Sequence, residues 1–275
     1  MKILAIGDLV GSPGRSILTQ HLHDYRIHNN IDFVICNGEN SAGGSGITGK
    51  IYRSLIHNGC DVITCGDHTF RNKEITSCID ADFFIRPANF SPKATGKGWV
   101  IAECNNKKVA VINLIGRVFM QPYENPFICV DNILNQIADQ ADIIIVDMHC
   151  EATSEKIAMG HHLDGRVTAV FGTHTHVQTS DARIFPKGTA HITDVGMTGP
   201  RNGVIGRRSE AVVYKFLTEM PCKFDVATED LVLEGAVINI GDDNKAISIK
   251  AVRLELDELL QISNSIKSDK SNQPD

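Results

Sequence analysis

Five short apolar runs in this chain are each followed by side chains that can bind a metal ion. The runs are rich in β-branched residues, as buried strands are, and comprise Ile3 to Ile6, Phe33 to Cys36, Val62 to Thr64, Ile143 to Val146 and Thr168 to Phe171. The side chains that follow them are Asp8, Glu39, Asn40, Asp67, His68, His149, His174 and His176. In open α/β sheets, ligands gather outside the carboxyl ends of the strands. We therefore expect these residues to form one site at one edge of a sheet.

Length and composition fit one large enzyme domain. The chain has 275 residues, of which 42% are hydrophobic, so it can bury a large core. Its formal net charge of -6 argues against a large nucleic-acid surface or binding to an anionic membrane, both of which call for a basic excess. A small anionic substrate is compatible with this charge, because bound metal cations would dominate the local field.

The start of the chain and its cysteines indicate a cytoplasmic protein. The first residues lack the long apolar core and the small-residue cleavage site of a signal peptide, and no segment reads as a membrane span. The eight cysteines form no Cys-x-x-Cys pair, and most lie inside apolar runs, as buried reduced thiols do. Cys150 directly follows His149, but successive side chains alternate along a strand, so we expect Cys150 to point away from the site.

Strand-like and helix-like segments alternate in the first half of the chain, which predicts an α/β architecture with parallel strand pairs. The expected helices are one that opens near Pro13, then Gly49 to Asn58, Lys73 to Ile79, Asn132 to Ala138 and Arg208 to Leu217. In the second half, the runs Leu231 to Ile240 and Ala246 to Leu256 alternate in part, which predicts antiparallel strands joined by a turn at Gly241 to Asn244. The pattern favours a mixed, two-sheet α/β sandwich.

We expect one catalytic domain over residues 1–258 and a polar C-terminal tail over 259–275. From Ser263 onward the chain is mostly Ser, Asn, Lys and Asp, which offers too little apolar surface to hold a fold. The tail is therefore predicted to be disordered.

The candidate ligands combine oxygen and nitrogen donors, a set that suits Fe, Mn, Zn or Co. Each residue also has an ordinary structural role, since Asp8 could cap a helix and Asn40 could serve a turn. Those roles do not explain why all five strand ends carry a metal-competent side chain. From the residues alone, the chain reads as a two-metal hydrolase.

The order of these clusters resembles that of the calcineurin-like metallophosphoesterases, and longer stretches resemble the bacterial YmdB family within them. These stretches are Gly7 to Arg15, Asn37 to Asn40, Arg86 to Phe90, Glu151 to Lys156 and Thr193 to Pro200. The resemblance implies a four-layer α/β/β/α sandwich with a dinuclear metal centre. It also implies phosphodiesterase activity on small cyclic nucleotides such as 2',3'-cAMP.

The resemblance further implies a role for each candidate residue. One metal would be bound by Asp8, Glu39, Asn40 and His176, and the other by Glu39, Asp67, His149 and His174, so that Glu39 bridges the two. A hydroxide between the metals would attack phosphorus, because coordination can lower the pKa of water to about 7. His68 is the expected general acid for the leaving alkoxide, and the alternative is a histidine that only orients a ligand.

Two positions depart from the usual motifs. Val10 stands where many metallophosphoesterases have the histidine of an Asp-x-His motif; Asn40 would replace it, and this oxygen-richer set favours iron or manganese over zinc. Asp67 stands where Asn is expected, and its added negative charge should hold the second metal more tightly. We expect two divalent or mixed-valence ions per chain, Fe or Mn.

Three functions are compatible with this sequence. The first, which we expect, is a phosphodiesterase for small cyclic nucleotides. The second is a phosphomonoesterase of the same fold, because substrate choice depends on rim residues that the motifs do not reveal. The third is a metal-bound regulatory or scaffolding protein with little turnover. Because family members tend to self-associate, we also expect a homo-oligomer.

Overall fold

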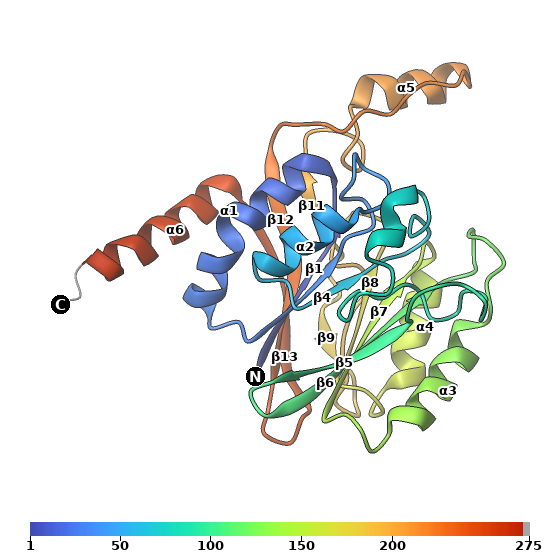
Figure 1. Ribbon diagram of the computed structural model, residues 1–275, viewed down its shortest axis with the longest axis vertical. Coiled ribbons are helices and arrows are strands. Elements are labelled where there is room, and N and C mark those ends of the chain that lie inside the picture. The colour runs from blue at the N-terminus through green and yellow to red at the C-terminus, as the bar shows by residue number, and fades with distance from the viewer. Residues whose placement is uncertain (272–275) are drawn as a thin grey trace.

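The computed structural model describes residues 1–271, which form two β-sheets packed face to face between two layers of helices (Figure 1). The first sheet has seven strands in the order β2-β11-β12-β1-β3-β4, with β13 paired to the other edge of β12. Its strands are β1 (Lys2–Ile6), β2 (Asp8–Leu9), β3 (Phe33–Asn37), β4 (Val62–Thr64), β11 (Met197–Pro200), β12 (Leu231–Ile240) and β13 (Ala246–Glu255).

The second sheet has six strands in the order β5-β6-β7-β8-β10-β9. They are β5 (Trp99–Cys104), β6 (Lys107–Ile115), β7 (Ile143–His149), β8 (Ala169–Thr173), β9 (Arg183–Ile184) and β10 (Ala190–Ile192). The strands that precede the candidate ligands run parallel, because β1 pairs with β3, β3 with β4, and β7 with β8 in this sense. Their carboxyl ends therefore lie at the same edge.

The core has three apolar layers, which explains why the central strands are hydrophobic on both faces. Ile3 and Ala5 of β1 belong to the layer between the sheets, whereas Leu4 and Ile6 pack under the helices of the first sheet. A strand that is covered on both faces reads as a continuous apolar run. Complete burial of each large aliphatic side chain stabilises the fold by roughly 1.5–3 kcal/mol.

The helices complete the sandwich. Helices α1 (Gly11–Asn29), α2 (Gly49–His57) and α6 (Leu256–Ser271) lie on the first sheet, and α3 (Pro126–Ile137) and α4 (Thr153–Leu163) lie on the second (Figure 1). Helix α5 (Ser209–Thr218) lies apart from both layers (Figure 1).

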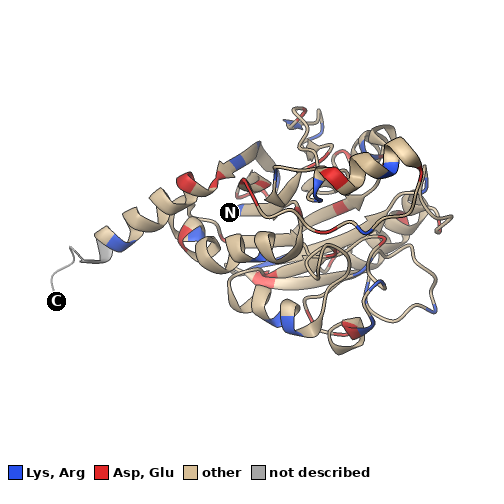
Figure 2. Ribbon diagram, turned by 90° about the horizontal axis from the view of Figure 1, so that it is seen from above, with Lys and Arg blue, Asp and Glu red and all other residues tan. Residues whose placement is uncertain are grey.

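Lys and Arg residues are interspersed with Asp and Glu residues along the ribbon (Figure 2). No helix within residues 1–271 is both long and apolar enough to cross a membrane.

The predicted mixed two-sheet architecture is confirmed, and several element boundaries need correction. The predicted helix Lys73 to Ile79 is a short 3-10 helix, η1 (Lys73–Ser77). The helix predicted from Asn132 begins at Pro126, where Asn125 accepts a hydrogen bond from the N–H of Phe127 and caps the first turn.

In the described part of the predicted tail the chain is helical, and α6 continues to Ser271. Leu259 is buried against the layer that contains α1, and the Oγ of Ser263 lies 3.1 Å from Nδ1 of His21. Asp257 and Glu258 occupy the first turn, where negative charge favours the helix dipole. The composition of this segment is polar on average, and that average concealed the few apolar residues of α6 that pack against the core. Residues 272–275 of the predicted tail lie outside the described residues.

Candidate metal centre

The structure brings all eight predicted site residues to one edge of the sandwich. They come from the ends of five strands: Asp8 follows β1, Glu39 and Asn40 follow β3, Asp67 and His68 follow β4, His149 ends β7, and His174 and His176 follow β8. A continuous series of contacts, each under 4 Å, joins them; all are between side chains except the hydrogen bond from the backbone N–H of His174 to Asp8. The eight residues therefore lie together at one place in the fold.

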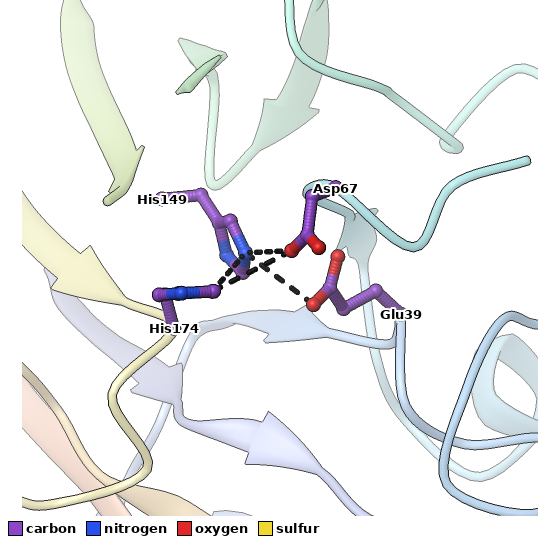
Figure 3. Close-up of side chains that lie close together, drawn as sticks. All are labelled: Glu39, Asp67, His149 and His174. Carbon is purple, nitrogen blue, oxygen red and sulfur yellow. Dashed lines mark hydrogen bonds and ion pairs between the residues drawn. The ribbon is translucent and has the colours of Figure 1, made fainter. Parts of the chain in front are cut away.

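Four of these residues form a tight cluster of donor atoms. Glu39, Asp67, His149 and His174 each offer one donor, and these atoms all lie within 4.8 Å of one another (Figure 3). Nε2 of His149 is 3.2 Å from an Asp67 oxygen and 3.3 Å from a Glu39 oxygen. Converging carboxylate and imidazole donors can hold a divalent transition metal.

The charges of the side chains in this cluster favour a bound cation. Burial by itself would lower the pKa of His149, but the carboxylates of Glu39 and Asp67 outweigh burial and raise that pKa well above its ordinary value. Burial would raise the pKa of Asp67, but hydrogen bonds with His149 and His174 outweigh burial and hold that pKa below its ordinary value. The carboxylates thus favour a protonated imidazole, and the imidazoles favour an ionised carboxylate, so the cluster is built to hold positive charge beside negative charge.

A second group of donors lies on the other side of Glu39. Oδ2 of Asp8 accepts a hydrogen bond from the N–H of His174 at 2.9 Å, whereas its Oδ1 is buried without a hydrogen-bond partner among the described residues. That oxygen is 3.8 Å from Nε2 of His176, which in turn lies 3.1 Å from Nδ2 of Asn40. A buried, unpaired carboxylate oxygen is costly, and a bound cation would satisfy it. The donor set therefore fits a metal here too.

Residues that the motif analysis missed orient His149. Thr173 donates its hydroxyl hydrogen to Asp147 at 2.7 Å, so its oxygen can accept from Nδ1 of His149 at 3.0 Å. This arrangement leaves Nε2 of His149 free to face Glu39 and Asp67. Burial raises the pKa of Asp147 to about 7. The available sequence signal was the position of Asp147 two residues before His149, which places both on the same face of the strand.

A buried ion pair supports the loop that carries His174 and His176. Lys156 has a fully buried side chain whose Nζ lies 2.6 Å from Oδ2 of Asp194. The same carboxylate accepts hydrogen bonds from the backbone N–H and the hydroxyl of Thr175, at 3.2 and 2.7 Å. Two of the sequence stretches that carry the family resemblance thus meet behind the ligand loop.

The backbone of this loop is unusual at both candidate ligands. His174 has φ of 100° and His176 has φ of 62°, in the left-handed region that non-glycine residues seldom adopt. Contacts outside the donor cluster fix the orientation of both imidazole rings. Nε2 of His174 lies 3.2 Å from a Glu151 oxygen, and Nδ1 of His176 lies 3.1 Å from the carbonyl oxygen of Ile205. The other nitrogen of each ring is left to face the site.

Cys150 points away from the donors, as predicted. Its Sγ lies 3.1 Å from a Glu155 oxygen, and burial raises the pKa of its thiol. A thiol in this state is a poor nucleophile. All eight cysteines are free.

Two face-to-face sheets between helix layers, with a histidine and carboxylate cluster at the strand ends, are the fold of the calcineurin-like metallophosphoesterase type. A 5'-nucleotidase precursor from Thermus thermophilus shares this fold, with a TM-score of 0.56 at 10% identity over 98% of this chain and 59% of that one. The predicted fold class is thus confirmed. Within that class, the chain belongs to the YmdB-like protein family, whose model matches residues 4–252.

Relatives cover nearly the whole chain. The chain is 48% identical over 256 residues to the 2',3'-cyclic-nucleotide 2'-phosphodiesterase of Bacillus subtilis (strain 168), covering 93% of this chain and 96% of that protein. The crystal structure of a novel phosphatase from Mycoplasma pneumoniae has a TM-score of 0.88, 35% identity and coverage of 93% of each chain. A hypothetical protein from Thermus thermophilus has a TM-score of 0.87 and 37% identity, covering 93% of this chain and 99% of that one.

Proposed function

We propose that this chain is a dinuclear-metal phosphodiesterase that hydrolyses small phosphodiesters such as 2',3'-cyclic nucleotides. The observation that carries this proposal is the donor cluster of Glu39, Asp67, His149 and His174, all within 4.8 Å, beside the unpartnered Oδ1 of Asp8. The enzyme class is phosphoric diester hydrolase, and the name of the B. subtilis relative supports both the class and the substrate.

The metal ligands are proposed as two sets that share Glu39. One ion would be held by Asp8, Glu39, Asn40 and His176, and the other by Glu39, Asp67, His149 and His174. Two cations bound there would offset the phosphate charge and bring the pKa of a water molecule to about 7, near neutrality. Iron or manganese suits the oxygen-rich donors.

His68 is the proposed general acid. Its side chain is 28% exposed and its ring nitrogens lie 3.5 Å from a Glu39 oxygen and 3.6 Å from an Asp67 oxygen. Nδ1 lies 2.7 Å from Oδ1 of Asn40, and a hydrogen bond there fixes the orientation of the ring. Nε2 is then the atom that holds the proton for the departing alkoxide oxygen.

The test is hydrolysis of 2',3'-cAMP by protein whose bound metals have been quantified. We expect Asp8→Ala to lose metal and turnover, and His68→Ala to retain metal but to lose turnover by about 10²-fold or more. His23→Ala, at an exposed position on α1, is the matched control and should behave as the wild type. A metal-loaded wild type that is inert toward every phosphoester would instead favour a regulatory or scaffolding role.

Phosphomonoesterase activity is the second candidate, because the similar M. pneumoniae protein is described as a phosphatase. A cyclic and a linear substrate separate the two. A phosphodiesterase converts 2',3'-cAMP to adenosine monophosphate and releases no inorganic phosphate, whereas a phosphomonoesterase leaves 2',3'-cAMP intact and releases inorganic phosphate from adenosine monophosphate.

We also propose that the protein is cytoplasmic and forms a homo-oligomer. Helix α5 exposes Phe216 and Leu217 at 82% and 79%, and it lies apart from both helix layers (Figure 1). Exposed apolar surface of this kind is common where two chains associate. Sedimentation analysis of the wild type and of Phe216→Ser would show a shift to smaller species in the variant. A monomeric wild type contradicts the prediction.

A further inference from the structure

The stretch Arg86 to Phe90, which the sequence analysis singled out, supplies no metal donor and instead builds a stack of aromatic rings. The ring of Phe90 lies 4.8 Å from that of Tyr123, at an interplanar angle of 28°, and 5.8 Å from that of Phe70, at 36°. We call Phe70, Phe90 and Tyr123 the aromatic shelf. Offset rings at these separations attract one another.

The aromatic shelf is held rigidly from behind. The side chain of Asn89 donates to the carbonyl oxygens of Ile115 and Glu124, both at 2.8 Å, and accepts from the N–H of Ile115 at 2.9 Å. The guanidinium of Arg86 donates to three backbone carbonyl groups and lies 5.9 Å from the centre of the Phe90 ring. A surface fixed in this way is organised before a ligand arrives, which lowers the entropy lost on binding.

The aromatic shelf lies next to the metal centre. Phe70 follows His68 by two residues, within a turn closed by the N–H of Arg71 and the carbonyl oxygen of His68 at 3.0 Å. Tyr123 comes from a different loop, yet the negative charges of Asp67 and Glu39 add to the effect of burial in raising its pKa. Phe70 therefore adjoins the residues of the acidic cluster along the chain, and Tyr123 is within range of their charge.

The rings of the shelf differ in exposure. Phe90 is only 6% exposed, whereas Phe70 is 48% exposed. A single exposed phenylalanine is ordinary on a protein surface. This one, however, is the open end of a rigid stack and follows the proposed general acid by two residues. A nucleotide whose phosphate occupies the metal centre carries its base one ribose away, which makes an open aromatic face beside that centre a natural partner for the base.

We propose that the aromatic shelf is a nucleobase subsite in which the base of the substrate stacks on Phe70. This inference rests on the proposed function, since it takes a nucleotide as the substrate. Stacking tolerates any base, because every base has a π-face. Loss of one such contact weakens binding by about 5- to 150-fold.

The experiment compares ligands with and without a base on the full-length, metal-loaded protein. Turnover is measured with 2',3'-cAMP and with glycerol 1,2-cyclic phosphate, which has the five-membered cyclic diester but no base. Equilibrium binding is measured with adenosine 2'-monophosphate and glycerol 2-phosphate. The variants are Phe70→Ala, Phe70→Leu and Phe70→Tyr, and the control is Ile247→Ala, at an exposed apolar position on β13.

We expect Phe70→Ala to raise KM for 2',3'-cAMP and Kd for adenosine 2'-monophosphate by about 5-fold or more, with kcat and both base-free ligands unchanged. Phe70→Tyr should retain wild-type values. Phe70→Leu, which keeps apolar volume but lacks a ring, should resemble Phe70→Ala. The inference is overturned if Phe70→Ala leaves the ratio between nucleotide and base-free ligand unchanged, or if Phe70→Leu behaves as the wild type.

The two proposals fail in different ways. A wild type that hydrolyses neither diester, but whose affinity for adenosine 2'-monophosphate depends on Phe70, refutes the phosphodiesterase and supports the subsite. Normal turnover of both diesters with no effect of Phe70→Ala on either ratio refutes the subsite and supports the phosphodiesterase.

Discussion

Lys156 offers the sharpest test of how the site is supported, because its charge is buried with a single ionic partner. Its Nζ lies 2.6 Å from Oδ2 of Asp194, and the side chains are 1% and 0% exposed. The substitution Lys156→Met keeps most of the side-chain volume and removes the charge. The carboxylate of Asp194 is then left buried without its cation.

The expected loss of stability depends on the hydrogen bonds that the carboxylate of Asp194 keeps. Removing one partner of a buried ion pair destabilises a protein by about 3–5 kcal/mol. Asp194 would keep hydrogen bonds from the N–H and hydroxyl of Thr175 at 3.2 and 2.7 Å, and from the N–H of Gly196 at 2.8 Å. These charge-assisted bonds continue to stabilise the carboxylate, so we expect the lower end, about 3 kcal/mol.

Urea unfolding of metal-free protein measures this loss without a contribution from bound ions. With a slope of about 3 kcal/mol per molar, the midpoint should fall by about 1 M at an unchanged slope. Lys50→Met, at an exposed position on α2, is the control and should change stability by about 0.5 kcal/mol or less. The double variant Lys156→Met/Asp194→Asn should be more stable than Lys156→Met alone. A loss below about 1 kcal/mol, or a double variant less stable than the single one, refutes the reasoning.

Three further predictions concern the same region. Asp147→Asn should lower metal affinity by about 10- to 100-fold, because Asp147 fixes the threonine that orients His149; chelator competition measures this, and an unchanged affinity would argue against that role. Gly172→Ala should destabilise the fold by about 1–3 kcal/mol or more, because the added Cβ would lie 1.8 Å from the carbonyl oxygen of Thr193; a Tm equal to that of the wild type would contradict the close approach. Adding Mn²⁺ to metal-free protein at about 100 times its Kd should stabilise it by about 2.7 kcal/mol, seen as a higher Tm that Asp67→Ala loses; no shift in the wild type would argue against a built metal site.

The positions of the candidate metal-binding residues could be predicted from the sequence because two local signals agree there. Runs such as Ile3 to Ile6 mark buried strands, and a polar side chain just past such a run has few ordinary reasons to recur at every strand end. Convergence then follows from parallel pairing, which the structure has for β1, β3 and β4.

Other elements lacked a clear local signal. Helix α4 starts after Ala152, which offers no side-chain cap. The hairpin of β5 and β6, by contrast, did carry a local signal. It turns at Asn105 and Asn106, whose φ values of 51° and 60° fit a tight turn with two left-handed residues, and the apolar runs Trp99 to Ala102 and Val109 to Ile112 flank that turn. Lys156 would be placed on a solvent-exposed helix face by its residue type alone, because its partner lies 38 positions further along the chain.

At His174 and His176, the stability of the left-handed backbone and the presence of an imidazole side chain favour different residues. A non-glycine residue held in that region costs of order 1–3 kcal/mol, whereas glycine adopts it freely. Selection for folding alone would therefore place glycine at both positions. Histidine occupies both positions although the backbone there is strained. A related chain with glycine at either position should therefore be more stable and should have lost a candidate metal-binding imidazole.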